Sequence, residues 1–231
     1  IQKVVIPQYG LPAKFKAVRI EFEQPYGAIV VTKTSASSGA ALSGAVFELL
    51  NSAGAVLQSQ TTGTDGSATF SNVQAGTYTV REKNAPQGYQ VSVQSSQTVT
   101  VAAGATSRIS FANAPIQGKI RIVKTDSLTH EPLAGVVFTV TRLSAPAGSN
   151  GAAVGSVVAT LTTGADGSAE TDWLEWGRYR IEETAVPAHY VDEPFRTEID
   201  CFEGGKTYEI AATNEPTKGW LRLTKTDRKN G

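Results

Sequence analysis

Apolar and polar residues alternate along most of this chain in short runs that are separated by turn residues. A period of two residues is typical of a β-strand with one buried face, and pairs such as Asp65-Gly66 favour tight hairpin turns. The pattern predicts seven short strands in the first half of the chain, which suit a β-sandwich. These strands are expected over 28–34, 44–50, 55–61, 67–71, 77–83, 96–102 and 106–113.

The chain contains an internal repeat of about one hundred residues. YGAIVVTKT (26–34) returns as QGKIRIVKT (117–125) and as KGWLRLTKT (218–226), and FANAP (111–115) returns as ATNEP (212–216). We therefore predict unit 1 over 25–116, unit 2 over 117–217, the start of a third unit over 218–231, and the terminal strands of a preceding domain over 1–24.

The register of the repeat holds along most of each unit. Glu82 to Asn113 and Glu183 to Asn214 are both separations of 31 residues. Unit 2 is ten residues longer between Lys124 and Glu183, and LSAPAGSNGAAVG (143–155) is rich in Pro, Gly, Ser and Asn. This composition predicts that a loop absorbs the difference.

Each unit has three polar residues on strand faces that are otherwise apolar. Lys33 shares a face with Ile29 and Val31, and Glu82 shares one with Tyr78 and Val80. Asn113 likewise follows Ile109 and Phe111. Lys124, Glu183 and Asn214 occupy the same places in unit 2. The pattern predicts that a lysine, a glutamate and an asparagine point into the core of each unit.

Two interpretations account for these inward groups. A lone buried charge costs several kcal/mol, so lysine and glutamate must lie close together, and a buried ion pair with an asparagine hydrogen bond satisfies that constraint. Alternatively, desolvation lowers the pKa of a lysine and raises that of a carboxylic acid. A neutral amine can then attack the asparagine carboxamide, with the glutamate moving protons and ammonia leaving, to give an isopeptide bond between strands.

The order of motifs resembles the Cna B-type, or SpaA-like, domains of Gram-positive pilins and surface adhesins. The resemblance rests on VVTKT and IRIVKTD, then PLAGVVF, TGADG, YTVREKNAPQGY and FANAP, and covers residues 25–231. It implies tandem inverse-immunoglobulin or transthyretin-like sandwiches, each with a self-made isopeptide bond. By residue, it implies bonds between Lys33 and Asn113 and between Lys124 and Asn214, catalysed by Glu82 and Glu183.

Unit 2 departs from this pattern at two aromatic positions. Phe70 and Phe111 of unit 1 correspond to Thr171 and Ala212. Trp173, Trp176 or Phe202 could shield the second site instead, and if none of them does, the second bond is the less certain of the two. Gln24 stands near the place of the asparagine in the preceding segment, where we expect no bond. The third lysine, Lys225, has its partners outside this sequence.

Composition removes several classes of function. Lys and Arg number 21 and Asp and Glu number 21, so a nucleic-acid partner is not expected, and no apolar run suits a membrane span. The single cysteine, Cys201, cannot form an internal disulfide. His130 and His189 lack metal-ligand spacing, so we expect no metal, no cofactor and no enzyme activity on other molecules.

The expected role is structural. We predict a stalk or pilus-shaft segment of an extracellular protein at the bacterial cell surface, attached to the cell wall or within a pilus. Its partners would be the neighbouring domains of the same chain, with a host ligand reached through a distal domain. The alternative is an adhesin module that binds a host matrix protein or glycan directly, through loop 143–155 or through Trp173 and Trp176.

Overall fold

The computed structural model describes residues 26–149, 151–191, 193, 195–219 and 221–225. All of its regular elements are β-strands, which confirms the all-β prediction. The predicted strands at 1–24, including Gln24, lie outside the described residues. The strands of unit 1 are β1 (Tyr26–Ser35), β2 (Val46–Leu50), β3 (Val56–Thr61), β4 (Ser67–Gln74), β5 (Gly76–Asn84), β6 (Ser96–Val101) and β7 (Thr106–Asn113). Those of unit 2 are β8 (Gln117–Asp126), β9 (Val137–Arg142), β10 (Val157–Thr162), β11 (Ser168–Glu170), β12 (Leu174–Glu175), β13 (Gly177–Ala185), β14 (Arg196–Cys201) and β15 (Thr207–Asn214).

Unit 1 is a sandwich of two sheets. One sheet has the strand order β4-β1-β7 and the other β3-β2-β5-β6. The first strand, β1, pairs antiparallel with β4 and parallel with the last strand, β7. All seven strands predicted from the alternating pattern are present, and the largest difference is at the end of β4, which reaches Gln74 instead of residue 71.

Unit 2 repeats this topology. Its first strand, β8, pairs parallel with the last strand, β15, and the second sheet has the order β10-β9-β13-β14. The strand equivalent to β4 is divided into two short pieces, β11 and β12, which both pair with β8.

Inward residues of the two sheets form a separate apolar core in each unit. Ile29, Phe47 and Phe70 are fully buried in unit 1, and Ile120, Phe138 and Ile181 are fully buried in unit 2. The core of unit 2 also contains Cys201, a free thiol whose pKa is raised by burial to about 12.

The Asp-Gly pairs are turns, as predicted. Gly66 has a φ of 72°, which a glycine adopts without steric cost, and Asp65 Oδ1 accepts a hydrogen bond from the Ser67 amide. The described residues contain no group of three or more acidic, cysteine or histidine side chains that could hold a metal ion.

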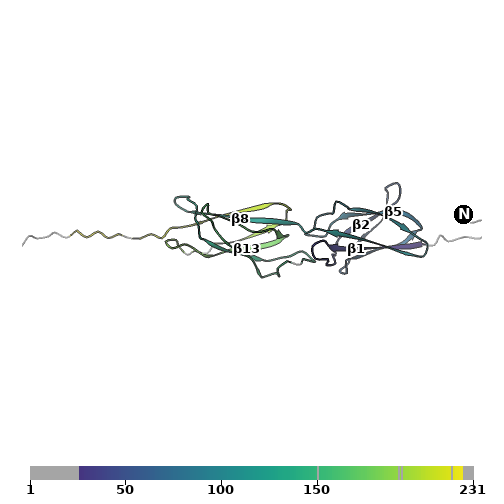
Figure 1. Cartoon of the computed structure of the whole chain (residues 1–231), viewed down its shortest axis with the longest axis horizontal. Helices are drawn as coiled ribbons and strands as arrows, with labels where there is room; N and C mark the ends of the chain where they lie inside the picture. Colours follow the sequence, from purple (N-terminus) through teal and green to yellow (C-terminus); the bar gives the residue numbers. More distant parts are fainter. Residues whose placement is uncertain (1–25, 150, 192, 194, 220, 226–231) are drawn as a thin grey trace, which may run out of the picture.

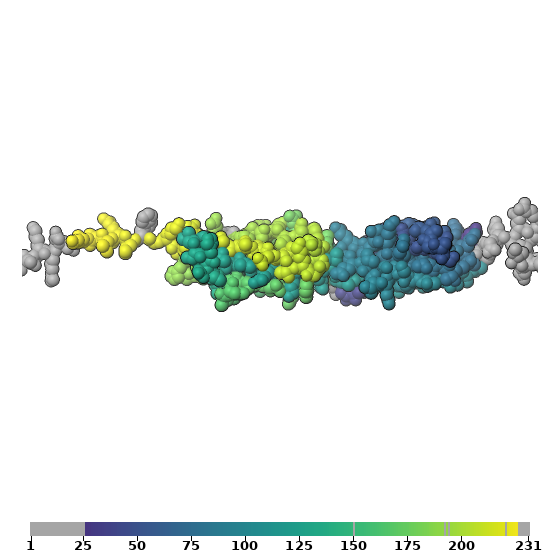
Figure 2. Space-filling model, turned by 90° about the horizontal axis from the view of Figure 1, so that it is seen from above, coloured from purple at the N-terminus to yellow at the C-terminus, as the bar shows by residue number. Residues whose placement is uncertain are grey.

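The two units lie end to end along the long axis of the molecule (Figures 1 and 2). Residues 114–116 connect β7 to β8. No helix in the described part of the chain is long and apolar enough to cross a membrane.

The expected opening strand of a third unit is not seen. The described residues 217–219 and 221–225 form no strand, and Lys225 is exposed. A β-strand needs a neighbouring strand to satisfy its backbone groups, and no described strand pairs with these residues.

Candidate functional site

The topology brings three polar residues of unit 1 together. Lys33 is on β1 and Asn113 is on β7, in the same sheet. In the parallel register Lys33 pairs with Phe111, so Asn113 lies two residues further along the adjacent strand with its side chain on the same face. Glu82 faces them from β5 in the opposite sheet.

These three side chains contact one another in unit 1. Lys33 Nζ lies 2.5 Å from Asn113 Oδ1 and 3.0 Å from Glu82 Oε1. Asn113 Nδ2 donates a hydrogen bond of 2.8 Å to the same glutamate oxygen. One oxygen of Glu82 therefore touches both nitrogens, while Oε2 has no hydrogen-bond partner among the described residues.

Unit 2 contains the same triad with a different use of the carboxyl group. Lys124 Nζ donates to Asn214 Oδ1 and lies 3.0 Å from Glu183 Oε2. Asn214 Nδ2 donates to the other glutamate oxygen, Oε1, at 2.6 Å. The structure thus places all six residues singled out from the sequence in two groups, one in each unit.

Both triads are shielded from water. The relative exposure of Lys33, Asn113 and Lys124 is 0%, and that of Glu82, Glu183 and Asn214 is 6% or less. Burial lowers the pKa of the Lys33 amine, and the hydrogen bond and negative charge of Glu82 oppose that shift. Lys124 has a lowered pKa for the same reason, opposed by Glu183. Each amine is thus shifted toward its neutral, nucleophilic form.

Aromatic rings cover the lysine in both units. In unit 1 the centroids of Phe47 and Phe111 are each 5.9 Å from Lys33 Nζ. In unit 2 Phe138 is 5.9 Å from Lys124 Nζ, and the second ring is Phe195 at 6.0 Å. Phe138 and Phe195 meet edge to face, with their centroids 6.3 Å apart.

The prediction that Trp173, Trp176 or Phe202 shields the second site is therefore wrong. Trp173 is 51% exposed, with Lys119 over its ring, and Trp176 stacks on Phe202. Phe195 precedes β14 and fills the place that Phe111 fills from β7. Alignment of the repeats could not find it, because the replacement comes from a different segment of the unit.

An amine, a carboxyl and a carboxamide in mutual contact, in a dry interior, are the groups required for amide exchange. The carboxyl can move protons between the two nitrogens, and the carboxamide carbon is bonded to the oxygen that already contacts the amine. The contacts themselves fit a buried ion pair as well as a reacting group.

Comparison with known proteins agrees with this repeat architecture. The family described as SpaA, prealbumin-like fold domain, matches residues 27–115 and 118–216. No curated protein matches the chain significantly.

Two solved structures are similar over most of the chain. The TIE protein of Bacillus anthracis is 26% identical, with a TM-score of 0.71 over 83% of this chain. This chain spans 34% of that protein's length. A C-terminal fragment of the pilus adhesin SpaC from Lactobacillus rhamnosus GG shares the fold, at 16% identity and a TM-score of 0.54. That likeness covers 85% of this chain and 100% of the fragment.

The family match confirms the resemblance drawn from the repeated motifs, and it covers both units almost completely. The chain belongs to the SpaA family of prealbumin-like fold domains, which it carries in two tandem copies.

Proposed function

We propose that each triad forms an intramolecular isopeptide bond without an external enzyme, and that the chain is a load-bearing segment of a bacterial surface stalk or pilus shaft. The observation that carries the proposal is the contact between amine, carboxyl and carboxamide in two separate buried sites. A single such contact would fit an ion pair that only fixes the strand register. The same three residues recur in both units, each time beneath aromatic rings, and this favours isopeptide bond formation.

The reaction begins with a proton transfer. The Lys33 ammonium gives a proton to the Glu82 carboxylate, 3.0 Å away. The neutral Nζ attacks Cγ of Asn113, an Nζ–Cγ bond forms, and the carbonyl electrons move to Oδ1. The transferred proton resides on Oε1, the carboxyl oxygen that also contacts Asn113 Nδ2.

The leaving step uses the same carboxyl group. Glu82 protonates Nδ2, the Cγ–Nδ2 bond breaks, the carbonyl re-forms, and ammonia leaves. Nζ then returns a proton to the carboxylate, so the product is a secondary amide, a protonated glutamate and one ammonia. Glu183 serves Lys124 and Asn214 in the same way. Because the fold holds the reactants in contact, high effective molarity replaces an external catalyst.

The position of the bond suits a mechanical role. It joins the first strand of a unit to its last, and these strands lead to the neighbouring segments of the chain. Closing a loop of 80 residues would add about 4.5 kcal/mol of stability by analogy with a disulfide. Unlike a disulfide, the amide resists reduction.

We place the parent protein outside the cell, on a bacterial surface. The support is family membership and the fold shared with a pilus adhesin fragment. A stalk of this kind holds a distal adhesive domain away from the cell. The loop considered for direct ligand binding instead contacts unit 1 through the carbonyl groups of Ala147 and Gly148, so the stalk role is the better supported of the two.

Intact-mass measurement tests the chemistry. We expect the purified chain to be lighter than its sequence by two ammonia molecules, with one restored in Lys33→Ala and one in Lys124→Ala. Glu82→Gln keeps the shape of the first site and should also restore one.

Lys83→Ala provides the control, because this lysine is also on β5 and its side chain is 58% exposed. It should leave the mass deficit unchanged. A wild-type chain of full mass would overturn the proposal.

A further inference from the structure

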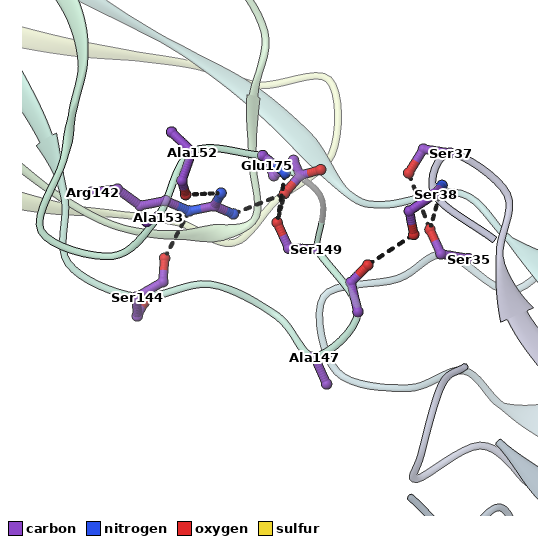
Figure 3. Close-up of polar contacts among 12 residues, drawn as sticks. Ser35, Ser37, Ser38, Arg142, Ser144, Ala147, Ser149, Ala152, Ala153 and Glu175 are labelled. Atoms are coloured by element: carbon purple, nitrogen blue, oxygen red, sulfur yellow. Dashed lines mark hydrogen bonds and ion pairs between the residues drawn. The ribbon is translucent and has the colours of Figure 1, made fainter. Parts of the chain in front are cut away.

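The inserted loop of unit 2 lies against unit 1. This loop connects β9 to β10, and we call residues 143–149 and 151–156 the β9–β10 loop. Tyr89 of unit 1 donates a hydrogen bond of 2.9 Å from its hydroxyl to the Ala147 carbonyl. Ser38 of unit 1 donates one of 3.0 Å to the Gly148 carbonyl (Figure 3).

Close packing accompanies these hydrogen bonds. A Cβ on Gly148 would lie 2.5 Å from the Leu42 side chain, and a Cβ on Gly88 would lie 2.5 Å from Pro146. Both glycines also have positive φ values, +71° and +84°. Leu42 is fully buried. The two units therefore touch through positions where no side chain fits.

A buried ion pair fixes the base of the loop. Arg142, only 2% exposed, donates from Nη2 to Glu175 Oε2 at 2.8 Å and from Nη1 to the Ala152 carbonyl at 3.0 Å. Ser149 also donates to Glu175 (Figure 3). The Glu175 carboxylate on β12 thus holds both Arg142, at the start of the loop, and Ser149, within it.

This ion pair accompanies the insertion. The residues of unit 1 equivalent to Arg142 and Glu175 are Asn51 and Gln74, and there the β2–β3 connection is only residues 51–55. Unit 1 therefore has neither the long loop nor the charges that shape it.

We infer that the β9–β10 loop is a bracket that docks on the end of unit 1 and fixes the orientation of the two units. Its partner is the preceding repeat, recognised through the Tyr89 and Ser38 hydroxyl groups and through the surface beside Leu42. The inference goes beyond the cross-links, because every contact it uses is noncovalent and the docking contacts lie between units.

The receiving surface is specific to unit 1. In unit 2 the tyrosine equivalent to Tyr89 is Tyr190, and its hydroxyl donates to Asp126 Oδ2 of its own unit at 3.0 Å. Unit 1 has Ser35 at the place of Asp126, and the Tyr89 hydroxyl donates to the loop carbonyl of Ala147 instead of to a carboxylate of its own unit. Lys124 is nevertheless fully buried, although no such loop lies over its unit among the described residues, so the bracket is not needed to exclude water from the reaction site.

The experiment measures the distance between the units in the whole chain. Spin labels on Ser59→Cys and Thr160→Cys stand on exposed positions of β3 and β10, and double electron–electron resonance gives their distance distribution. Cys201 is fully buried and does not compete for the label. We expect a single narrow distribution.

Two variants should lose that narrow distribution. One is Gly148→Ala, and the other replaces residues 142–156 with the equivalent unit 1 sequence NSAGA. Gly155→Ala is the matched control, because Gly155 has a φ of +89° but nothing within 4 Å of an added Cβ, so it bears the same backbone strain without the clash.

The bracket is refuted by a broad distribution in the parent chain, or by a narrow one in the loop-replacement variant. Intact mass of the same samples should show an unchanged loss of ammonia. A failure of the bracket is thereby separated from a failure of the cross-linking chemistry.

Discussion

Glu82→Gln should convert unit 1 from an inextensible segment into one that unravels under tension. The amide nitrogen of glutamine cannot accept the proton that the lysine must lose, so the bond between Lys33 and Asn113 does not form. Pulling at the two ends of the chain loads β1 and β7. With the bond in place, the tension passes directly from Lys33 to Asn113, and the residues between them carry no load.

The hidden length follows from the position of the bond. Lys33 and Asn113 are 80 residues apart in sequence, and an extended chain spans at most about 3.5 Å per residue, so the bond conceals about 280 Å. Lys124 and Asn214 are 90 residues apart, which corresponds to about 315 Å.

Single-molecule force spectroscopy measures these lengths directly. The parent chain should release neither of these two lengths. Glu82→Gln should release the shorter length, which the first bond encloses, and Glu183→Gln should release the longer one. Glu48→Gln is the matched control: Glu48 is buried on β2 but pairs with Arg81 and Lys83 outside the triad, and it should behave as the parent. A parent chain that releases about 280 Å while its mass shows both bonds would refute this mechanical reasoning.

Two further predictions concern the surroundings of the amines. The Asn113→Ala variant keeps Lys33 and Glu82 but cannot form the cross-link. Its unit 1 should gain stability as the pH rises from the lowered pKa of Lys33 toward 10.5, because in this range the unfolded chain binds more protons than the folded chain. Urea unfolding at several pH values measures this, and a further Lys33→Met change should abolish the gain. Phe195→Ala should slow formation of the second bond but not of the first, as measured by time-resolved mass spectrometry of newly folded chain. The same change should destabilise unit 2 by no more than about 3 kcal/mol, since the ring is only partly buried. A second bond that forms as fast in Phe195→Ala as in the parent chain would contradict the shielding role.

The repeat and the alternating pattern were sufficient to predict the strands of unit 1 and the burial of the three polar residues in each unit. Lys33, Glu82 and Asn113 could be recognised because a period of two residues assigns each one to a face, and a buried charge needs a partner. The sequence alone could not place Phe195, which reaches the second site from the segment before β14. Shielding depends on which rings converge in space, and convergence of distant segments leaves no local pattern.

The same limit applies to the β9–β10 loop. Its composition predicts a loop, but its contacts depend on the small residues of another unit, Ser38 and Gly88, which look like ordinary turn residues in isolation. The buried Arg142 also shares the inward face of β9 with Phe138 and Val140, and only the structure shows that Glu175 accepts its hydrogen bond.

Extension and bending are resisted by different parts of this molecule. An isopeptide bond in each unit would prevent lengthening, because tension would pass from β1 through Lys33 and Asn113 into residues 114–116 and then into β8. Such a bond does nothing against bending at the connector, since it lies wholly within one unit. A bracket that crosses the joint, held by Tyr89 and Ser38, supplies that resistance. A stiff rod needs both, so loss of the bracket should leave the chain as strong as before but less straight.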